Sequence, residues 1–150
     1  MHPVESQALD SPSEFVARQA QQYVASDGTD IEHPFADRVF LLYFTGRKSG
    51  QIRRVPLVCV EDGDDLIIVA SKGGADHHPT WYLNIKADPN VWVRNKADFY
   101  EARATTLEGQ ERAVAFGKMK DAMGFFAEYE QKTDRVMPVI RLSRREHSTD

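Results

Sequence analysis

Three runs of strand-forming residues follow one another closely in the first half of the chain, and they constrain the fold more than any other feature. The runs cover residues 39–45, 53–61 and 66–70, and short segments containing glycine separate them. Parallel strands need a crossover of about a dozen residues or more, whereas antiparallel strands can be joined by a tight turn. The spacing therefore predicts an antiparallel meander over residues 39–70 and excludes a βαβ unit there.

The second half of the chain continues with short strands and short helices. The pattern predicts strands over residues 91–94, 99–105 and 135–142, and helices over residues 79–86 and 123–129, with a further helix opened by a capping box at Thr105 and Glu108. About six antiparallel strands should close into a small barrel, because closure removes exposed strand edges. The expected fold class is mainly β with flanking helices.

The chain contains one domain and two expected tails. Residues 1–10 show little apolar periodicity and are expected to form a flexible tail. Residues 11–14 (Ser-Pro-Ser-Glu) should open a helix with Ser11 as its cap. The domain is expected to span residues 11–143, and residues 144–150 to form a C-terminal tail.

The overall charge of the chain is acidic, with a formal net charge of -4 over 150 residues. Nucleic-acid binding usually needs a basic face, so no nucleic-acid partner is expected. No apolar run approaches the roughly 20 residues needed to cross a bilayer. The N-terminus also lacks the pattern of a signal peptide. A cytoplasmic location is therefore expected.

Cysteine and histidine chemistry is not expected to carry the function. The single cysteine, Cys59, excludes an internal disulfide and lies in an apolar strand, where we interpret it as a small buried hydrophobe. His77 and His78 are adjacent, so their side chains point in different directions, and no acidic or cysteine cluster accompanies them. No metal site is predicted.

Residues 46–54 form a local cluster of positive charge, with four cations and no acid in an otherwise acidic chain. Glycines beside these cations leave backbone N–H groups free to approach an anion closely. A second glycine turn at residues 70–74 also carries a lysine. These turns predict a pocket for an anionic, phosphorylated tail of a ligand.

Four sequence motifs together cover most of the chain from Phe40 to Leu142. They are TGRKSGQIRRVPL (45–57), DGDDLIIVASKGG (62–74), HPTWYLNIKADPNVWV (78–93) and TDRVMPVIRL (133–142). In this order and spacing they resemble the deazaflavin-dependent nitroreductase family, which are oxidoreductases of actinobacteria. The resemblance implies a single-domain split β-barrel of the FMN-binding type, with coenzyme F420 in its reduced form, F420H2, as the cofactor.

The resemblance also implies which residues bind this cofactor, a polyanion with a phosphate and a tail of glutamates. The matching residues are Arg47, Lys48, Ser49, Arg53, Pro56, Leu57, Ser71, Lys72, Gly73, Trp81 and Asn84. The cations among them are placed along the tail, since arginine forms forked, charge-assisted bonds with phosphate and carboxylate. Pro56 and Leu57 are placed against the deazaflavin ring. Arg54 lies outside this set and is expected to face solvent.

The acceptor side departs from the nitroimidazole-reducing members of the family, which carry several tyrosines there. The corresponding residues, expected to bind the substrate, are Val58, Met123, Phe126 and Tyr129. Only Tyr129 keeps a phenol, and we interpret it as the catalytic residue. Either Tyr129 or solvent then delivers a proton to the reduced acceptor. An apolar pocket favours flat, uncharged molecules. We therefore predict an F420H2-dependent reductase of quinones, or of unsaturated esters and lactones of coumarin type, with nitro compounds less favoured.

Other hypotheses stay open at this point. A related split barrel could bind FMN, whose phosphate would also use Arg47 and Lys48. The protein could instead carry F420 without catalysis, or be an interaction domain whose cations serve only solubility. A membrane-surface role of the N-terminal helix is not predicted, since Arg18 is the only cation on its polar face. The expected partner is a small apolar substrate, and the protein is expected to be a monomer or a weak homodimer.

Overall fold

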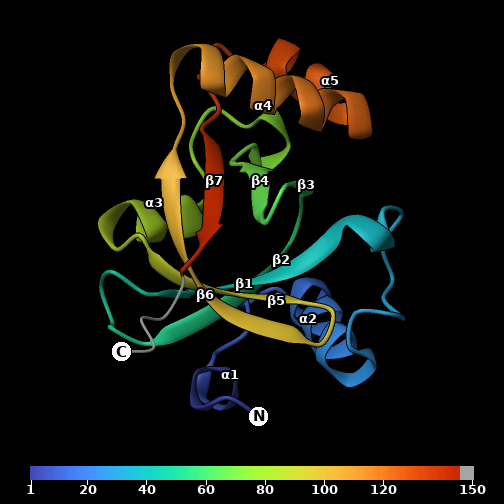
Figure 1. The fold of residues 1–150 in the computed structure, drawn as a ribbon, viewed down its shortest axis with the longest axis vertical. Coiled ribbons are helices and arrows are strands. Elements are labelled where there is room, and N and C mark those ends of the chain that lie inside the picture. The colour runs from blue at the N-terminus through green and yellow to red at the C-terminus, as the bar shows by residue number, and fades with distance from the viewer. Residues whose placement is uncertain (146–150) are drawn as a thin grey trace.

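The computed structural model describes residues 1–145 and shows a curved sheet with helices around it (Figure 1). The strands are β1 (Val39–Thr45), β2 (Ile52–Val58), β3 (Val60–Asp62), β4 (Asp65–Val69), β5 (Asn90–Asn95), β6 (Asp98–Thr106) and β7 (Val139–Arg144). The helices are α1 (Pro3–Gln7), α2 (Glu14–Ser26), α3 (Thr80–Ala87), α4 (Gly109–Ala122) and α5 (Phe125–Lys132), with 3-10 turns η1 (Ala36–Arg38) and η2 (Lys72–Gly74). In Figure 1, α4 and α5 lie at one end of the sheet, and α1 and α2 lie at the other.

The order of the strands forces the sheet to curl. Seven antiparallel strands pair in the order β2-β1-β5-β6-β7-β4-β3. β2 and β3 lie at opposite ends of this order, yet only Cys59 separates them in the chain. One residue cannot span an open sheet of this width, so the two ends must approach each other. The expected mainly β barrel-like fold is confirmed.

The strand expected over residues 53–61 is broken at Cys59, which makes seven strands rather than about six. The Cys59 N–H donates to the carbonyl of Arg38 at 3.0 Å instead of joining a strand ladder. The chain therefore leaves β1 and joins β4 on the far side. The pairings of the meander expected over residues 39–70 are present, because β1 pairs with β2 and β3 pairs with β4. The middle strand of that meander is however divided between the two ends of the sheet order.

β1 is buried on both faces, as its continuous apolar run predicts. Phe40, Leu42 and Phe44 point into the barrel, where they pack with residues of β4, β5 and β7. Leu41 and Tyr43 point the other way, toward α1 and α2. Cys59 is buried in the barrel core, and this burial raises the pKa of its thiol to about 12. The thiol is therefore protonated at neutral pH and acts as core.

The cap of α2 differs from the expected one. Ser13 is the N-cap, and its hydroxyl accepts from the Val16 N–H at 3.4 Å. Ser11 accepts from the N–H of Ser13 instead, so the helix begins after the expected capping residue. α2 ends at Ser26, and its C-cap Asp27 has a left-handed φ of 51°.

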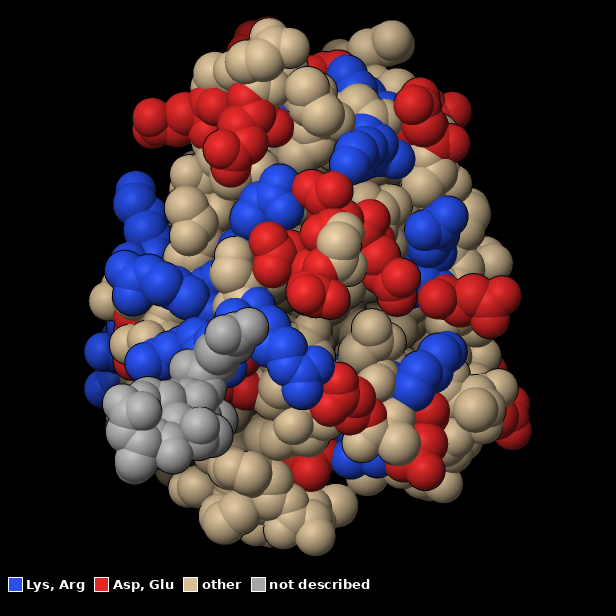
Figure 2. All heavy atoms as spheres, viewed as in Figure 1, with Lys and Arg blue, Asp and Glu red and all other residues tan. Residues whose placement is uncertain are grey.

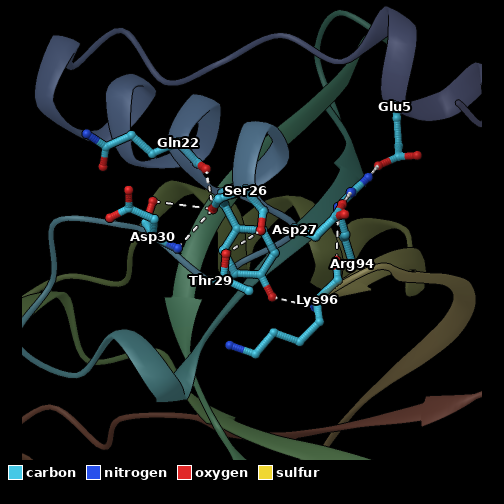
Figure 3. Close-up of polar contacts among 9 residues, drawn as sticks. Glu5, Gln22, Ser26, Asp27, Thr29, Asp30, Arg94 and Lys96 are labelled. Atoms are coloured by element: carbon cyan, nitrogen blue, oxygen red, sulfur yellow. Dashed lines mark hydrogen bonds and ion pairs between the residues drawn. The ribbon is translucent and has the colours of Figure 1, made fainter.

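The first ten residues are tied to the domain, which differs from the flexible tail expected there. The Glu5 carboxylate is buried and pairs with the Arg94 guanidinium of β5, which also pairs with Asp27 at the end of α2 (Figure 3). Leu9 forms a parallel bridge with Arg53 on β2. The partners of these residues are far away in the sequence, which explains the missing local pattern.

The C-terminal end of the chain is described only in part. Of the tail expected over residues 144–150, Arg144 ends β7, and residues 146–150 lie outside the described part of the chain. Within residues 1–145, no helix combines the length and the apolar character that a membrane span requires.

Replacing Arg94 by methionine should destabilise the fold strongly, because it leaves the buried charge of Glu5 without a partner. The Glu5 side chain is 4% exposed, so we expect a loss of about 3–5 kcal/mol in the free energy of unfolding, measured by urea denaturation. The matched control, Asp27→Asn, removes a carboxylate that is 58% exposed and should cost less than about 1 kcal/mol. Equal losses of unfolding free energy in the two variants would contradict the view that burial of the Glu5 charge causes the destabilisation.

Candidate functional site

A cavity of about 420 Å³ lies between β2, η2, α5 and the segment that joins α2 to β1. We call it the apolar cavity. Seven of the residues singled out from the sequence meet there: Pro56, Leu57, Val58, Ser71, Gly73, Phe126 and Tyr129. They come from three elements that are far apart in the chain. The curl of the sheet is what brings β2 opposite η2.

Met123 is an expected substrate-binding residue that does not line this cavity. Its side chain is 1% exposed and packs in the core with α4, β4 and β7. The helix expected over residues 123–129 begins only at Phe125. Met123 is instead the C-cap of α4, and its N–H donates to the carbonyl of Met119 at 2.9 Å. The break between the two helices changes the helical phase, so the Met123 side chain points into the core.

Sequence reasoning missed the other half of the lining. These residues are Gln19, His33, Pro34, Phe35, Val39, Val69 and Phe125. Phe35 and Phe125 form one wall, with ring centroids 5.3 Å apart. The segment that carries His33 and Phe35 has no periodicity, so only its aromatic and histidine side chains signal a role.

The β1–β2 turn carries the cluster of positive charge. Arg47 and Lys48 are exposed at its tip. Ser49 accepts from the N–H of Gln51 at 3.1 Å, and a Cβ on Gly46 would lie 2.8 Å from the Ser49 hydroxyl oxygen. A side chain at position 46 would therefore displace the Ser49 hydroxyl from its place in this turn. Lys and Arg side chains gather along the left side of Figure 2, where Figure 1 places this turn and α3.

Asn84 anchors this turn to α3. The Asn84 side chain is 5% exposed, and its Oδ1 accepts from the backbone N–H of Arg47 at 3.0 Å and from the Arg47 guanidinium at 3.3 Å. Asn84 therefore holds the backbone of the turn at Arg47, and it orients the Arg47 side chain that a ligand would contact. The contact of Asn84 with the cofactor stays a prediction, and the structure adds this positioning contact to it.

A second hollow, of about 300 Å³, lies on the other side of Pro56 along β2. Arg53, Trp81 and Asn84 line it, so three more expected site residues are brought together. The Arg54 guanidinium also lies here but pairs with Asp10 at 2.6 Å. The expectation that Arg54 faces solvent is wrong, because this pair buries it to 12% side-chain exposure. Arg53 to Val55 line the second hollow, and Pro56 to Val58 line the apolar cavity.

The η2 turn borders the apolar cavity and has an unusual backbone. Lys72, Gly73 and Gly74 all have positive φ values, of 46°, 63° and 80°. The Lys72 ammonium contacts Nε2 of His77. A Cβ on Gly74 would lie 2.9 Å from the carbonyl oxygen of Tyr129, so this glycine lets η2 pack directly on α5. That contact holds the backbone of Tyr129, which lines the apolar cavity, against η2.

Arg135 holds this turn from the other side. Its guanidinium donates to the carbonyl oxygens of Ala70, Ser71 and Ala75 at 3.0, 2.6 and 2.9 Å. It also donates to Nδ1 of His78 at 2.7 Å. Burial and the Arg135 charge lower the pKa of His78, so His78 is neutral at pH 7 and can accept this bond. Because Arg135 turns toward η2, β7 begins at Val139 and not at residue 135 as expected.

The remaining chemistry of the described chain is limited. Within residues 1–145, no group of three or more His, Cys, Asp or Glu side chains is arranged to hold a metal ion. The arrangement therefore offers apolar walls, a few hydrogen-bonding side chains and a charged turn. Such a site can bind and orient a flat molecule with an anionic end.

Comparison with known proteins gives this geometry a context. Residues 15–143 match the family model of the F420H(2)-dependent quinone reductases. The chain is 33% identical over 115 residues to an F420H(2)-dependent quinone reductase of Mycobacterium tuberculosis, which covers 75% of this chain and 77% of that protein.

Two solved structures are similar in both sequence and fold. One is described as an F420-H2 dependent reductase, with 41% identity and a TM-score of 0.67 over 71% of this chain and 94% of that one. The other is described as a domain-swapped dimer, with 35% identity and a TM-score of 0.69 over 89% of this chain and 100% of that one.

Replacing Arg135 by methionine should loosen the η2 turn, because three carbonyl oxygens lose their donor. The amide hydrogens of Gly74 and Ala75, which bond within the turn, should exchange at least about ten times faster, measured by hydrogen exchange and mass spectrometry or NMR. The control Arg112→Met removes a hydrogen bond to the carbonyl of Met137 and a contact with the Phe116 ring. Because neither partner belongs to η2, this control should leave η2 unchanged. Unchanged exchange in the Arg135 variant would contradict the clamp.

Proposed function

The chain belongs to the F420H(2)-dependent quinone reductase family, and from this premise we propose that it is an F420H2-dependent oxidoreductase that reduces a flat, apolar quinone. The observation that carries the proposal is the arrangement along β2. Its first half leads from the positively charged turn, and its second half lines the apolar cavity. One cofactor with an anionic tail and a flat ring matches both ends of this strand.

The residues present fit the cofactor. F420 carries a phosphate and glutamates, so its tail would lie along Arg47, Lys48 and Arg53. Its ring would lie against Pro56 and Leu57, which line the apolar cavity. At Gly73 an added Cβ would meet no protein atom, so this residue leaves space beside the ring. We assign Ser49, Ser71, Lys72, Trp81 and Asn84 supporting roles around the cofactor.

Bound reduced F420 supplies a hydride, and the chain supplies position, charge and shielding from water. The aromatic wall of Phe35, Phe125 and Phe126 removes the acceptor from water, which strengthens polar interactions inside the cavity. Tyr129 lines the same cavity, with its ring 5.3 Å from that of Phe125. We assign its phenol O–H to proton delivery at the acceptor oxygen, where negative charge develops.

The acceptor range follows from the lining. Val58 and Phe126 are apolar, and Tyr129 offers a phenol, so the cavity favours stacking and burial over multiple hydrogen bonds. We propose quinones as the main class, with coumarin-type lactones and other unsaturated carbonyl compounds as weaker acceptors. We propose nitro compounds as the least favoured class of acceptor. Met123 is not part of this proposal, because it lies outside the cavity lining.

Turnover is the direct test of this function. Mixing F420H2, protein and menadione in a stopped-flow instrument should show protein-dependent oxidation of F420H2. The readout is the return of the absorbance of oxidised F420. Tight F420 binding without oxidation by any quinone, lactone or nitro compound would favour a carrier. Copurification of a yellow flavin and no F420 binding would favour the FMN alternative.

Arg47→Ala and Lys48→Ala should each weaken F420 binding, because each removes a charge-assisted contact to the tail. We expect about 1.5–3 kcal/mol for each variant, or roughly 10- to 150-fold in Kd, measured by isothermal titration at low salt. The control Lys118→Ala removes a cation that pairs with Asp62 on β3, away from both hollows. An equal loss in the control, or none in the turn variants, would overturn the assignment of the tail.

A further inference from the structure

His33 is a polar residue of the apolar cavity that the proposed function leaves without a role. Four lining side chains can form hydrogen bonds: Gln19, His33, Ser71 and Tyr129. The Gln19 amide already donates to the carbonyl oxygen of Glu32 at 2.7 Å. This bond fixes the backbone immediately before His33 to the buried side of α2.

A second bond fixes the imidazole ring itself. The backbone N–H of Phe35 donates to Nδ1 of His33 at 2.9 Å. A nitrogen that accepts a hydrogen bond carries no proton, so the proton of the neutral ring is on Nε2. Burial lowers the pKa of His33, which keeps the ring neutral at pH 7. The result is one imidazole N–H donor of defined position.

This donor has no hydrogen-bond partner among the residues that the structure describes. Among residues 1–145, the only hydrogen bond of the His33 ring is the one at Nδ1. The centroid of the neighbouring Phe35 ring lies 6.5 Å from that of the imidazole, and the Phe35 ring contacts Phe125 in the aromatic wall of the cavity. An unpaired donor beside an apolar wall suits a ligand that combines a flat ring with a carbonyl oxygen.

We propose that His33 is an acceptor-binding residue, whose Nε2–H donates a hydrogen bond to the carbonyl oxygen of the quinone that is reduced. This inference deepens the proposed function and rests on it. Hydride transfer adds two electrons and one proton to the quinone and leaves a hydroquinone monoanion with its negative charge on oxygen. The second proton comes from Tyr129 or water, and His33 keeps its own.

A fixed donor at this oxygen favours the transition state over the bound quinone. The oxygen is weakly negative in the quinone and carries a full charge in the product anion, so the bond strengthens as hydride is transferred. His33 therefore affects kcat more than the binding of F420. Its contact also selects acceptors with a carbonyl oxygen.

Two substitutions separate this role from a structural role in the turn. His33→Asn keeps an acceptor close to the position of Nδ1, because an asparagine oxygen accepts from the N–H two residues ahead, but its amide is too short to reach the position of Nε2. His33→Gln places an amide N–H near Nε2 but loses the acceptor at Nδ1. The pair thus removes one function of the ring at a time.

We expect His33→Asn to lower kcat with menadione roughly 100-fold, as removal of one oxyanion donor does, with unchanged F420 affinity and Tm. His33→Gln should stay within about tenfold of the unsubstituted protein in kcat, although its Tm falls. The opposite pattern, with Asn active and Gln impaired, would assign His33 to the turn alone. Full activity of both variants would also overturn the proposal.

Nitrogen-15 NMR of the imidazole gives a readout without turnover. In the complex with oxidised F420, addition of menadione should shift the His33 Nε2 and its proton, while Nδ1 moves little. No shift at menadione concentrations that saturate turnover would overturn the proposal. If the unsubstituted protein fails to bind F420 or to oxidise F420H2, the proposed function itself fails, which is a separate result.

Discussion

The continuity of β2 and β3 is the constraint on which the rest of the structure depends. These strands lie at opposite ends of the sheet order, and Cys59 alone joins them. The sheet has to curl, and its curl brings the end of β2 opposite the end of β4. The walls of the apolar cavity, Val58 on one side and Val69 on the other, follow from this closure.

The loops of the site are held by polar side chains that come from other elements. Asn84 holds the β1–β2 turn, Arg135 holds η2, and Gln19 holds the segment before His33. In each case a side chain from another part of the chain bonds a backbone group of the loop, and the Asn84 and Gln19 side chains are themselves buried. The site therefore keeps its shape although regular strands supply only part of its lining. Preorganised loops of this kind reduce the ordering cost of binding.

Local patterns in the sequence predict the elements better than their partners. The apolar run of β1 and the glycine-containing turn that follows it are visible in the sequence and match the structure. The bonds from Arg135 to Ser71 and from Arg94 to Glu5 join residues 64 and 89 positions apart, so no local periodicity reports them. The prediction that Met123 binds the substrate was wrong about its position, because the break between α4 and α5 changes the helical phase there.

The first residues of the chain also shield an edge that the barrel would otherwise leave bare. Leu9 exchanges backbone hydrogen bonds with the outer side of β2, at Ile52 and Arg54, and it precedes the family match that begins at residue 15. An unprotected edge strand is a template for strands of other molecules. A shortened protein that lacks Leu9 would present this template, and intermolecular β-sheet assembly would then compete with the native fold in concentrated preparations.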